Sequence, residues 1–135
     1  MNFEHFLGLY LEQRMDPVIV CNLESEVAQA IGARVTRVWL SRDTLDKQKV
    51  RHPDLRPEDY RALKPALLLG EVRLESPKSA IVLYVDTRLL DWGLRVHLKA
   101  TVNGREIYTD SFCRLRRSAY RRELAKAYPV VRAHK

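Results

Sequence analysis

The chain has 135 residues, of which 24 are Lys or Arg and 17 are Asp or Glu, so its formal net charge is +7 at pH 7. This length suits one domain with a single core, and 46% hydrophobic residues with only five glycines exclude a disordered chain. No apolar stretch reaches the roughly 20 residues of a membrane-spanning helix, and the first residues lack the pattern of a signal peptide.

The positive charge is concentrated in the second half of the chain. Residues 1–34 carry a net charge of −3, whereas residues 76–135 carry +8. A one-sided basic surface attracts polyanions and speeds their encounter. We therefore expect a nucleic-acid partner, with contact to an acidic protein surface or simple solubility as the alternatives.

The first 34 residues differ in composition from the rest. Apolar residues at helical spacing predict an amphipathic helix over residues 3–12, and a second helix is expected over residues 24–31. Between them, residues 18–21 predict a short buried strand or an apolar link. We expect residues 1–34 to form an acidic helical extension that caps the domain or binds a partner.

The next segment predicts a strand followed by a helix with a defined end. Residues 35–40 are β-branched and aromatic, which is typical of a strand. Ser41 is expected to cap a helix that runs from Thr44 to about Arg51. Because Pro53 pushes the preceding residue out of the α region, His52 is expected at the end of that helix.

Strands dominate the second half of the chain. After a helix beginning at Pro57 and an apolar turn that ends at Gly70, four segments alternate or are strongly apolar: residues 71–75, 80–85, 92–102 and 105–114. A basic helix is expected over residues 119–127. These elements predict an α+β fold, with N-terminal helices, a roughly four-stranded antiparallel sheet and a C-terminal basic helix. The expected units are 1–34 (extension), 35–118 (the α+β domain) and 119–135 (basic helix and tail).

The dipeptide Asn103-Gly104 is a strong hairpin signal and predicts a register. With a two-residue turn, Lys99 pairs with Tyr108 and His97 pairs with Asp110. This counting leaves Ser111 on the core side of the strand unless a bulge intervenes. His97 shares a face with Lys99, and we interpret it as a sheet-face histidine.

Two sequence elements resemble a nuclease family. They are Lys47-Gln48-x-x-x-His52-Pro53 and Lys99-x-Thr101-x-x-Gly104-x-Glu106-x-Tyr108-x-x-Ser111-Phe112. Together they resemble the phage branch of the barnase–EndoU–colicin–RelE-like ribonucleases, which are often fused to or found beside head-morphogenesis proteins. The likeness covers residues 35–118. It implies helices before a four-stranded antiparallel sheet, a ribonuclease-like domain and metal-independent RNA cleavage.

Metal-free cleavage of RNA through the 2′-OH needs a base, an acid and cations that hold the phosphate. A histidine can serve as base or acid near neutral pH, and Lys, Arg and hydroxyl groups can hold phosphate oxygens. The candidate catalytic residues are His52, Lys99, Thr101, Ser111 and Arg114. The candidate nucleic-acid-binding residues are Lys47, Arg51, Tyr108, Arg116 and Arg117. The alternative role for His52 is bonding to carbonyls at the helix end, and for Tyr108 it is packing.

Other chemistries lack a signal in this sequence. There is no zinc spacing, no Gly-rich phosphate loop and no nucleophile elbow, and Cys21 and Cys113 fit two buried thiols of a cytosolic protein. We therefore predict no metal and no cofactor. The expected partner is RNA, with tRNA as one option, and phage head, portal or neck proteins are further options; no membrane is expected. The expected location is the host bacterial cytoplasm or the virion. Two alternatives to an enzyme stay open, namely a catalytically silent head or neck protein and a non-catalytic nucleic-acid-binding module.

Overall fold

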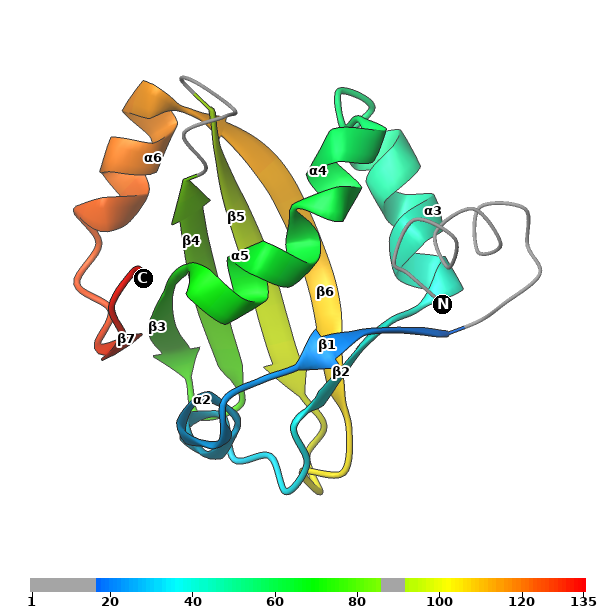
Figure 1. The fold of residues 1–135 in the computed structure, drawn as a ribbon, viewed down its shortest axis with the longest axis vertical. Helices are drawn as coiled ribbons and strands as arrows, with labels where there is room; N and C mark the ends of the chain where they lie inside the picture. The colour runs from blue at the N-terminus through cyan, green and yellow to red at the C-terminus, as the bar shows by residue number, and fades with distance from the viewer. Residues whose placement is uncertain (1–16, 86–91) are drawn as a thin grey trace.

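The computed structural model describes residues 17–85 and 92–135, and a seven-stranded sheet forms their centre (Figure 1). The strands are β1 (Val18–Asn22), β2 (Arg37–Leu40), β3 (Glu71–Ser76), β4 (Ser79–Val85), β5 (Trp92–Ala100), β6 (Ile107–Arg116) and β7 (Val130–Arg132). Their order in the sheet is β1-β2-β6-β5-β4-β3-β7. β2 and β6 run parallel, and every other neighbouring pair is antiparallel.

Most of the helices pack on one face of this sheet. The helices are α2 (Ser25–Ala30), α3 (Arg42–Arg51), α4 (Pro57–Arg61), α5 (Leu63–Leu69) and α6 (Arg117–Leu124). Figure 1 shows α4 and α5 lying across the near face of the central strands, with α3 beside β6. The main core is buried between these helices and the sheet, and it includes Leu63 and Leu67 of α5 with Val96, Leu98 and Phe112 of the strands. Burial of these apolar side chains supplies most of the driving force for the fold.

The predicted fold class, with N-terminal helices ahead of a roughly four-stranded antiparallel sheet, is wrong. The sheet has seven strands, one pair of which is parallel, and α2 to α5 lie between strands. The strands outside the predicted four are β1, β2 and β7, which are five, four and three residues long. The sequence predicts a strand over residues 35–40 and a short strand or apolar link over residues 18–21, but it places neither in the sheet, and it predicts no strand at β7. These three short strands join the sheet because neighbouring strands satisfy their backbone hydrogen bonds.

Both ends of the described chain belong to this sheet. β1 pairs with β2, and Leu23, Val27 and Ile31 from the predicted N-terminal extension are buried in the main core. At the other end, β7 follows α6 and pairs with β3. The helix predicted over residues 3–12 lies outside the described residues.

The opposite face of the sheet, which we call the open face, is covered only in part. Helix α6 packs there through Ala119 and Tyr120 onto a small cluster of Ile81, Leu83 and Leu115. The buried Arg73 of β3 anchors the end of α6, because its guanidinium donates hydrogen bonds to the carbonyls of Leu124 (3.0 Å) and Lys126 (2.8 Å). Beyond α6, the open face carries polar and charged side chains.

Helix α3 has the predicted cap and the predicted end, although its first helical residue is Arg42 and not Thr44. The hydroxyl of Ser41 accepts a hydrogen bond from the backbone N–H of Thr44 (3.2 Å), so Ser41 is the N-cap. At the other end, His52 is the C-cap, and its backbone N–H donates to the carbonyl of Gln48 (2.8 Å). The ten residues of α3, with a length of about 15 Å, therefore separate Ser41 from His52.

The hairpin between β5 and β6 turns at Asn103-Gly104 as predicted, but the turn is longer than two residues, because the ladder ends at the pair of Ala100 with Ile107 and the N–H of Gly104 donates to the carbonyl of Thr101 (2.9 Å). Gly104 has a φ of +73°, and Lys99 pairs with Tyr108 as predicted. Further along, a bulge breaks the ladder, so His97 pairs with Ser111 and not with Asp110. The predicted pairing of His97 with Asp110 is therefore wrong, because one extra residue is inserted into β6. The same bulge moves Ser111 off the core side.

Candidate functional site

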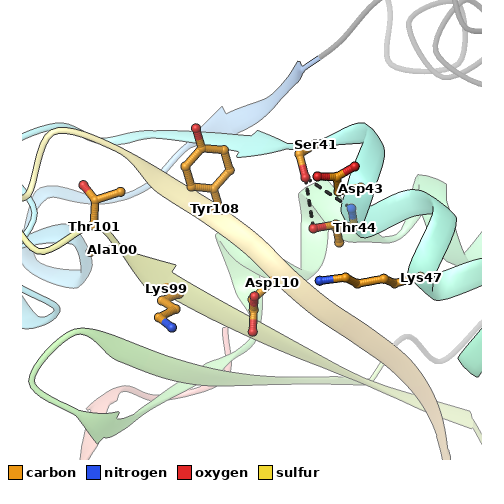
Figure 2. Close-up of a pocket in the computed structure, with 9 residues that line it drawn as sticks. All are labelled: Ser41, Asp43, Thr44, Lys47, Lys99, Ala100, Thr101, Tyr108 and Asp110. Carbon is orange, nitrogen blue, oxygen red and sulfur yellow. Dashed lines mark hydrogen bonds between the residues drawn. The ribbon is translucent and has the colours of Figure 1, made fainter.

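A pocket on the open face gathers four of the ten predicted site residues. Its volume is about 250 Å³, and we call it the lysine pocket. It is lined by Ser41, Asp43, Thr44, Lys47, Lys99, Ala100, Thr101, Tyr108 and Asp110 (Figure 2). Residues in and next to α3, β5 and β6 build it. Helix α3 starts directly after β2 and lies against the part of β6 that β2 does not reach. Lys47 reaches from α3 toward Asp110 on β6 (Figure 2).

Hydrogen bonds within the hairpin hold one wall of the lysine pocket. The Thr101 hydroxyl accepts from the backbone N–H of Glu106 (3.1 Å) and donates to the side-chain oxygen of Asn103 (2.9 Å). The hydroxyl of Tyr108 donates to a carboxylate oxygen of Glu106 (2.6 Å). Thr101 therefore shapes the turn, and its hydroxyl is already engaged. The two lysines of the pocket, Lys47 and Lys99, are exposed to solvent.

A second hollow lies beside the lysine pocket. It has a volume of about 460 Å³ and is lined by Asn22, Val35, Thr36, Arg37, Trp39, Arg105 and Glu106; we call it the tryptophan hollow. The parallel pairing of β2 with β6 sets Trp39 next to Tyr108. The guanidinium of Arg37 lies 5.8 Å from the ring centre of Trp39, within the range of a cation–π contact. Two half-buried aromatic residues therefore lie side by side, with two cations in each adjoining hollow.

Other predicted residues lie at the far end of β6. Arg114 and Arg116 line a hollow of about 460 Å³ with Pro53, Asp54, Leu55 and Arg56, which we call the arginine pocket. Arg51 and His52 directly precede that lining, and Arg117 begins α6 immediately after it. Neither His52 nor Arg114 lines the lysine pocket. The structure thus divides the predicted residues between two separate places, while Ser111 pairs with His97 on the open face.

Arg114 is committed to a buried carboxylate. Its Nε lies 3.5 Å from an oxygen of Asp59, and both side chains are about nine-tenths or more buried. Burial raises the pKa of Asp59, and a hydrogen bond from the Arg56 N–H with the charge of Arg114 offsets only part of that rise. Arg114 therefore acts first as a partner for Asp59.

A group that sequence reasoning missed lies on the open face next to the lysine pocket. The imidazole of His97 contacts two carboxylates: its Nδ1 lies 2.9 Å from an oxygen of Asp110, and its Nε2 lies 2.7 Å from an oxygen of Glu75. The hydroxyl of Ser79 also donates to Glu75 (3.0 Å). Glu75 comes from β3, two strands away from His97 on β5, so no local spacing pointed to it. Two signals were usable: His97 shares a face with Lys99, and the predicted register set His97 opposite Asp110.

This environment favours the ionised form of Glu75. Burial alone raises the pKa of the carboxyl group, but the hydrogen bonds from His97 and Ser79 and the charges of His97 and Arg95 outweigh that effect. The pKa of Glu75 is therefore below its ordinary value. Arg95 is itself paired, because its guanidinium lies 3.0 Å from a carboxylate oxygen of Glu123.

In residues 17–85 and 92–135, no group of three or more His, Cys, Asp or Glu side chains is arranged to hold a metal ion. No helix in these ranges is both long and apolar enough to cross a membrane. The chain was also compared with protein-family models, curated proteins and solved structures. None of these comparisons found a match. The resemblance to phage nucleases therefore stays a prediction.

Proposed function

We propose that this chain binds single-stranded RNA on the open face of its sheet and cleaves it without a metal ion. The observation that carries the proposal is the lysine pocket, where Lys47, Lys99 and Tyr108 come together from three elements. Lysines neutralise phosphates and release their counterions, and an aromatic ring offers a face on which a base stacks. A site for a single strand needs both features, namely cations for the phosphates and an aromatic surface for the bases.

The pair of aromatic residues supports the choice of a single strand. Trp39 and Tyr108 are neighbours on adjacent strands, which stand about 4.8 Å apart. In a duplex the bases are stacked on one another, so the rings can receive bases only from an unpaired strand. Arg37 and Arg105 in the tryptophan hollow are suited to hold the phosphates on one side of these rings, and Lys47 and Lys99 those on the other.

The proposed reaction is attack of a ribose 2′-OH on the adjacent phosphorus. Negative charge accumulates on the phosphate oxygens in the transition state, and Lys99 is placed to stabilise it. This is also the reaction that the resemblance of residues 35–118 to phage ribonucleases implies. We propose that the chain acts in the host bacterial cytoplasm or within the virion, where phage head, portal or neck proteins are its candidate protein partners.

One observation favours a second function, namely RNA binding without cleavage. His52 and Arg114, both predicted to be catalytic, lie away from the lysine pocket, and the hydroxyl of Thr101 is engaged in the hairpin. If these were the residues needed for cleavage, the chain would bind RNA and leave it intact. The two functions predict the same binding surface and differ in whether the RNA is cut.

Two measurements test the proposal. Total RNA and purified tRNA are incubated with the protein in EDTA, and the ends of any products are analysed; 2′,3′-cyclic phosphate ends are expected. The affinity for a labelled single-stranded RNA is measured by fluorescence anisotropy between about 50 mM and about 200 mM salt, and it is expected to fall steeply. Binding without cutting would select the second function. Affinity that does not change with salt would contradict both functions.

Variants locate the binding surface. Replacement of Trp39 or Tyr108 by Leu is expected to weaken RNA binding, because loss of one stacking face costs about 1–3 kcal/mol per base. Tyr128→Leu is the matched control, since Tyr128 follows α6 and lines none of the three pockets described above. Equal affinity of all the variants and wild type would place RNA elsewhere on the protein.

A further inference from the structure

Both ring nitrogens of His97 face carboxylates. Both of its nitrogens lie within hydrogen-bond distance of carboxylate oxygens, one from Asp110 and one from Glu75. A neutral imidazole carries a single N–H, whereas an imidazolium donates from both nitrogens. An imidazolium at this position can therefore donate to both carboxylates at once, and in that form it is also a proton donor. The side chain of His97 remains about one-fifth exposed, so the ring is not sealed from the surface.

Asp110 connects this histidine to the lysine pocket. Its carboxylate contacts Nδ1 of His97 and also lines the pocket with Lys47 and Lys99. The carboxylate is about half exposed, so it is open to a bound molecule. The bulge in β6 makes this double role possible, because Asp110 is the inserted residue beside the His97–Ser111 pair. Bulges of this kind re-aim side chains near functional sites.

The charged groups around His97 fit one proton-transfer reaction on RNA. Glu75 from β3 and Asp110 from β6 supply negative charge, Ser79 from β4 bonds to Glu75, and Lys99 and Arg95 lie on the same face of β5. Of these two cations, Arg95 is paired with Glu123, whereas Lys99 lines the lysine pocket. The group therefore combines a proton acceptor, a proton donor and a cation for the phosphate.

We propose that Asp110 is the general base and His97 the general acid of the RNA cleavage reaction, an inference that rests on the function proposed above. The carboxylate of Asp110 takes the proton of the 2′-OH while the O2′–P bond forms. Nδ1 of His97 gives its proton to the 5′-oxygen while the P–O5′ bond breaks. The products are a 2′,3′-cyclic phosphate and a free 5′-OH.

The hydrogen bond between the two residues then completes the cycle. After the reaction Asp110 holds one proton and Nδ1 of His97 has lost one, so transfer across the 2.9 Å contact restores both groups. Glu75 keeps its bond to Nε2 throughout and acts as a positioning residue. His52, at the far end of α3, takes no part in these steps.

The test compares His97→Gln and Asp110→Asn with wild type in EDTA. Cleavage of an RNA oligonucleotide is expected to fall by about a hundredfold or more in each variant. Binding to the 2′-O-methyl version of the same oligonucleotide, which has no 2′-OH to react, is expected to persist. His134→Gln and Asp46→Asn are matched controls on exposed residues outside the pocket, and both are expected to cleave normally. Thermal midpoints are recorded for every variant, and Asp110→Asn decides the outcome if His97→Gln fails to fold.

The pH profile provides a second readout. Wild type is expected to show a bell-shaped dependence of the cleavage rate on pH, because the reaction needs an ionised Asp110 and a protonated His97. Asp110→Asn is expected to lose the acidic limb from its residual activity. Normal cleavage by His97→Gln, or a loss of binding that matches the loss of cleavage, would overturn this inference and leave the proposed function standing. Failure of wild type to cleave any RNA would overturn both.

Discussion

The side-chain amide of Gln48 donates a hydrogen bond to the backbone carbonyl of Phe112, and this bond joins α3 to the edge of β6. Gln48 is 2% exposed and Phe112 is 1% exposed, so water does not replace the bond if it is lost. β2 is too short to pair with this part of β6, and Gln48 takes the place of a strand partner. In the sequence Gln48 belongs to the Lys47-Gln48-x-x-x-His52-Pro53 element, and its observed contact is structural.

Replacement of Gln48 by Ala is therefore expected to lower the free energy of unfolding by about 1–3 kcal/mol, because the Phe112 carbonyl is left buried without this donor. Urea denaturation followed by circular dichroism measures the change. Lys49→Ala, on the exposed side of the same helix, serves as the control. Equal stability of the Gln48 variant and this control would contradict the assigned role.

Thr109 offers the opposite case, a buried hydroxyl that costs stability. It is completely buried, and its hydroxyl has no hydrogen-bond partner in the part of the chain that the structure describes. Thr109→Val replaces the hydroxyl by a methyl group of similar size. The expected result is a gain of about 1 kcal/mol in the free energy of unfolding. Thr101→Val is the contrast, because the hydroxyl of Thr101 is used in the hairpin, and it is expected to lose stability.

Lys99 is expected to matter for activity and not for folding. Its side chain is exposed on the open face, so Lys99→Ala removes a charge without opening a cavity. RNA cleavage is expected to fall about tenfold or more, because the transition state loses a cation. The thermal midpoint is expected to stay within a few degrees of wild type. Lys64→Ala, at an exposed position of α5, controls for net charge. A parallel loss of folding and activity would show that Lys99 is structural.

The lowered pKa of Glu75 predicts how acid affects stability. Because the pKa of this carboxyl is lower in the folded protein than its ordinary value of 4.5, the unfolded chain binds a proton first as the pH falls. The contribution of Glu75 is therefore present above about pH 4.5 and is lost as the pH falls through the folded value. Glu75→Gln is expected to flatten this acid limb in urea denaturation curves between pH 3 and pH 6. Glu26→Gln, at an exposed position of α2, is the control and is expected to leave the limb as in wild type.

Cys21 predicts a change at the alkaline end. Burial raises the pKa of its thiol from 9.0 to about 12, although the charges of Lys64 and Arg132 oppose that rise. Between these two values the folded protein keeps a proton that the unfolded chain releases, so the free energy of unfolding falls as the pH rises. Cys21→Ala is expected to reduce this slope. Iodoacetamide at pH 8 is expected to label Cys21 only after denaturation, and rapid labelling of the native protein would contradict its burial.

Four residues of the candidate site could be predicted from short stretches of sequence, whereas the position of His52 relative to them could not. The four predicted residues Lys47, Lys99, Thr101 and Tyr108 line one pocket because a short helix and a tight hairpin fix their positions. His52 was grouped with them by sequence pattern. The straight length of α3 carries it away from Lys99, and a spacing of a few residues along a motif says nothing about which end of a helix faces which strand.

The amino-acid sequence by itself determined the elements that depend on neighbouring residues. Ser41 and Pro53 set the two ends of α3, and Asn103-Gly104 set the hairpin and the pairing of Lys99 with Tyr108. These features arise from capping, proline sterics and turn geometry, which act over a few residues.

Only the tertiary structure decided the rest. The parallel pairing that brings Trp39 beside Tyr108, the bulge at Asp110 and the reach of His97 to Glu75 join segments up to 69 residues apart. Such contacts depend on how the whole sheet is assembled, because each strand takes the partners that satisfy its hydrogen bonds and bury its apolar face. No window of sequence contains that information.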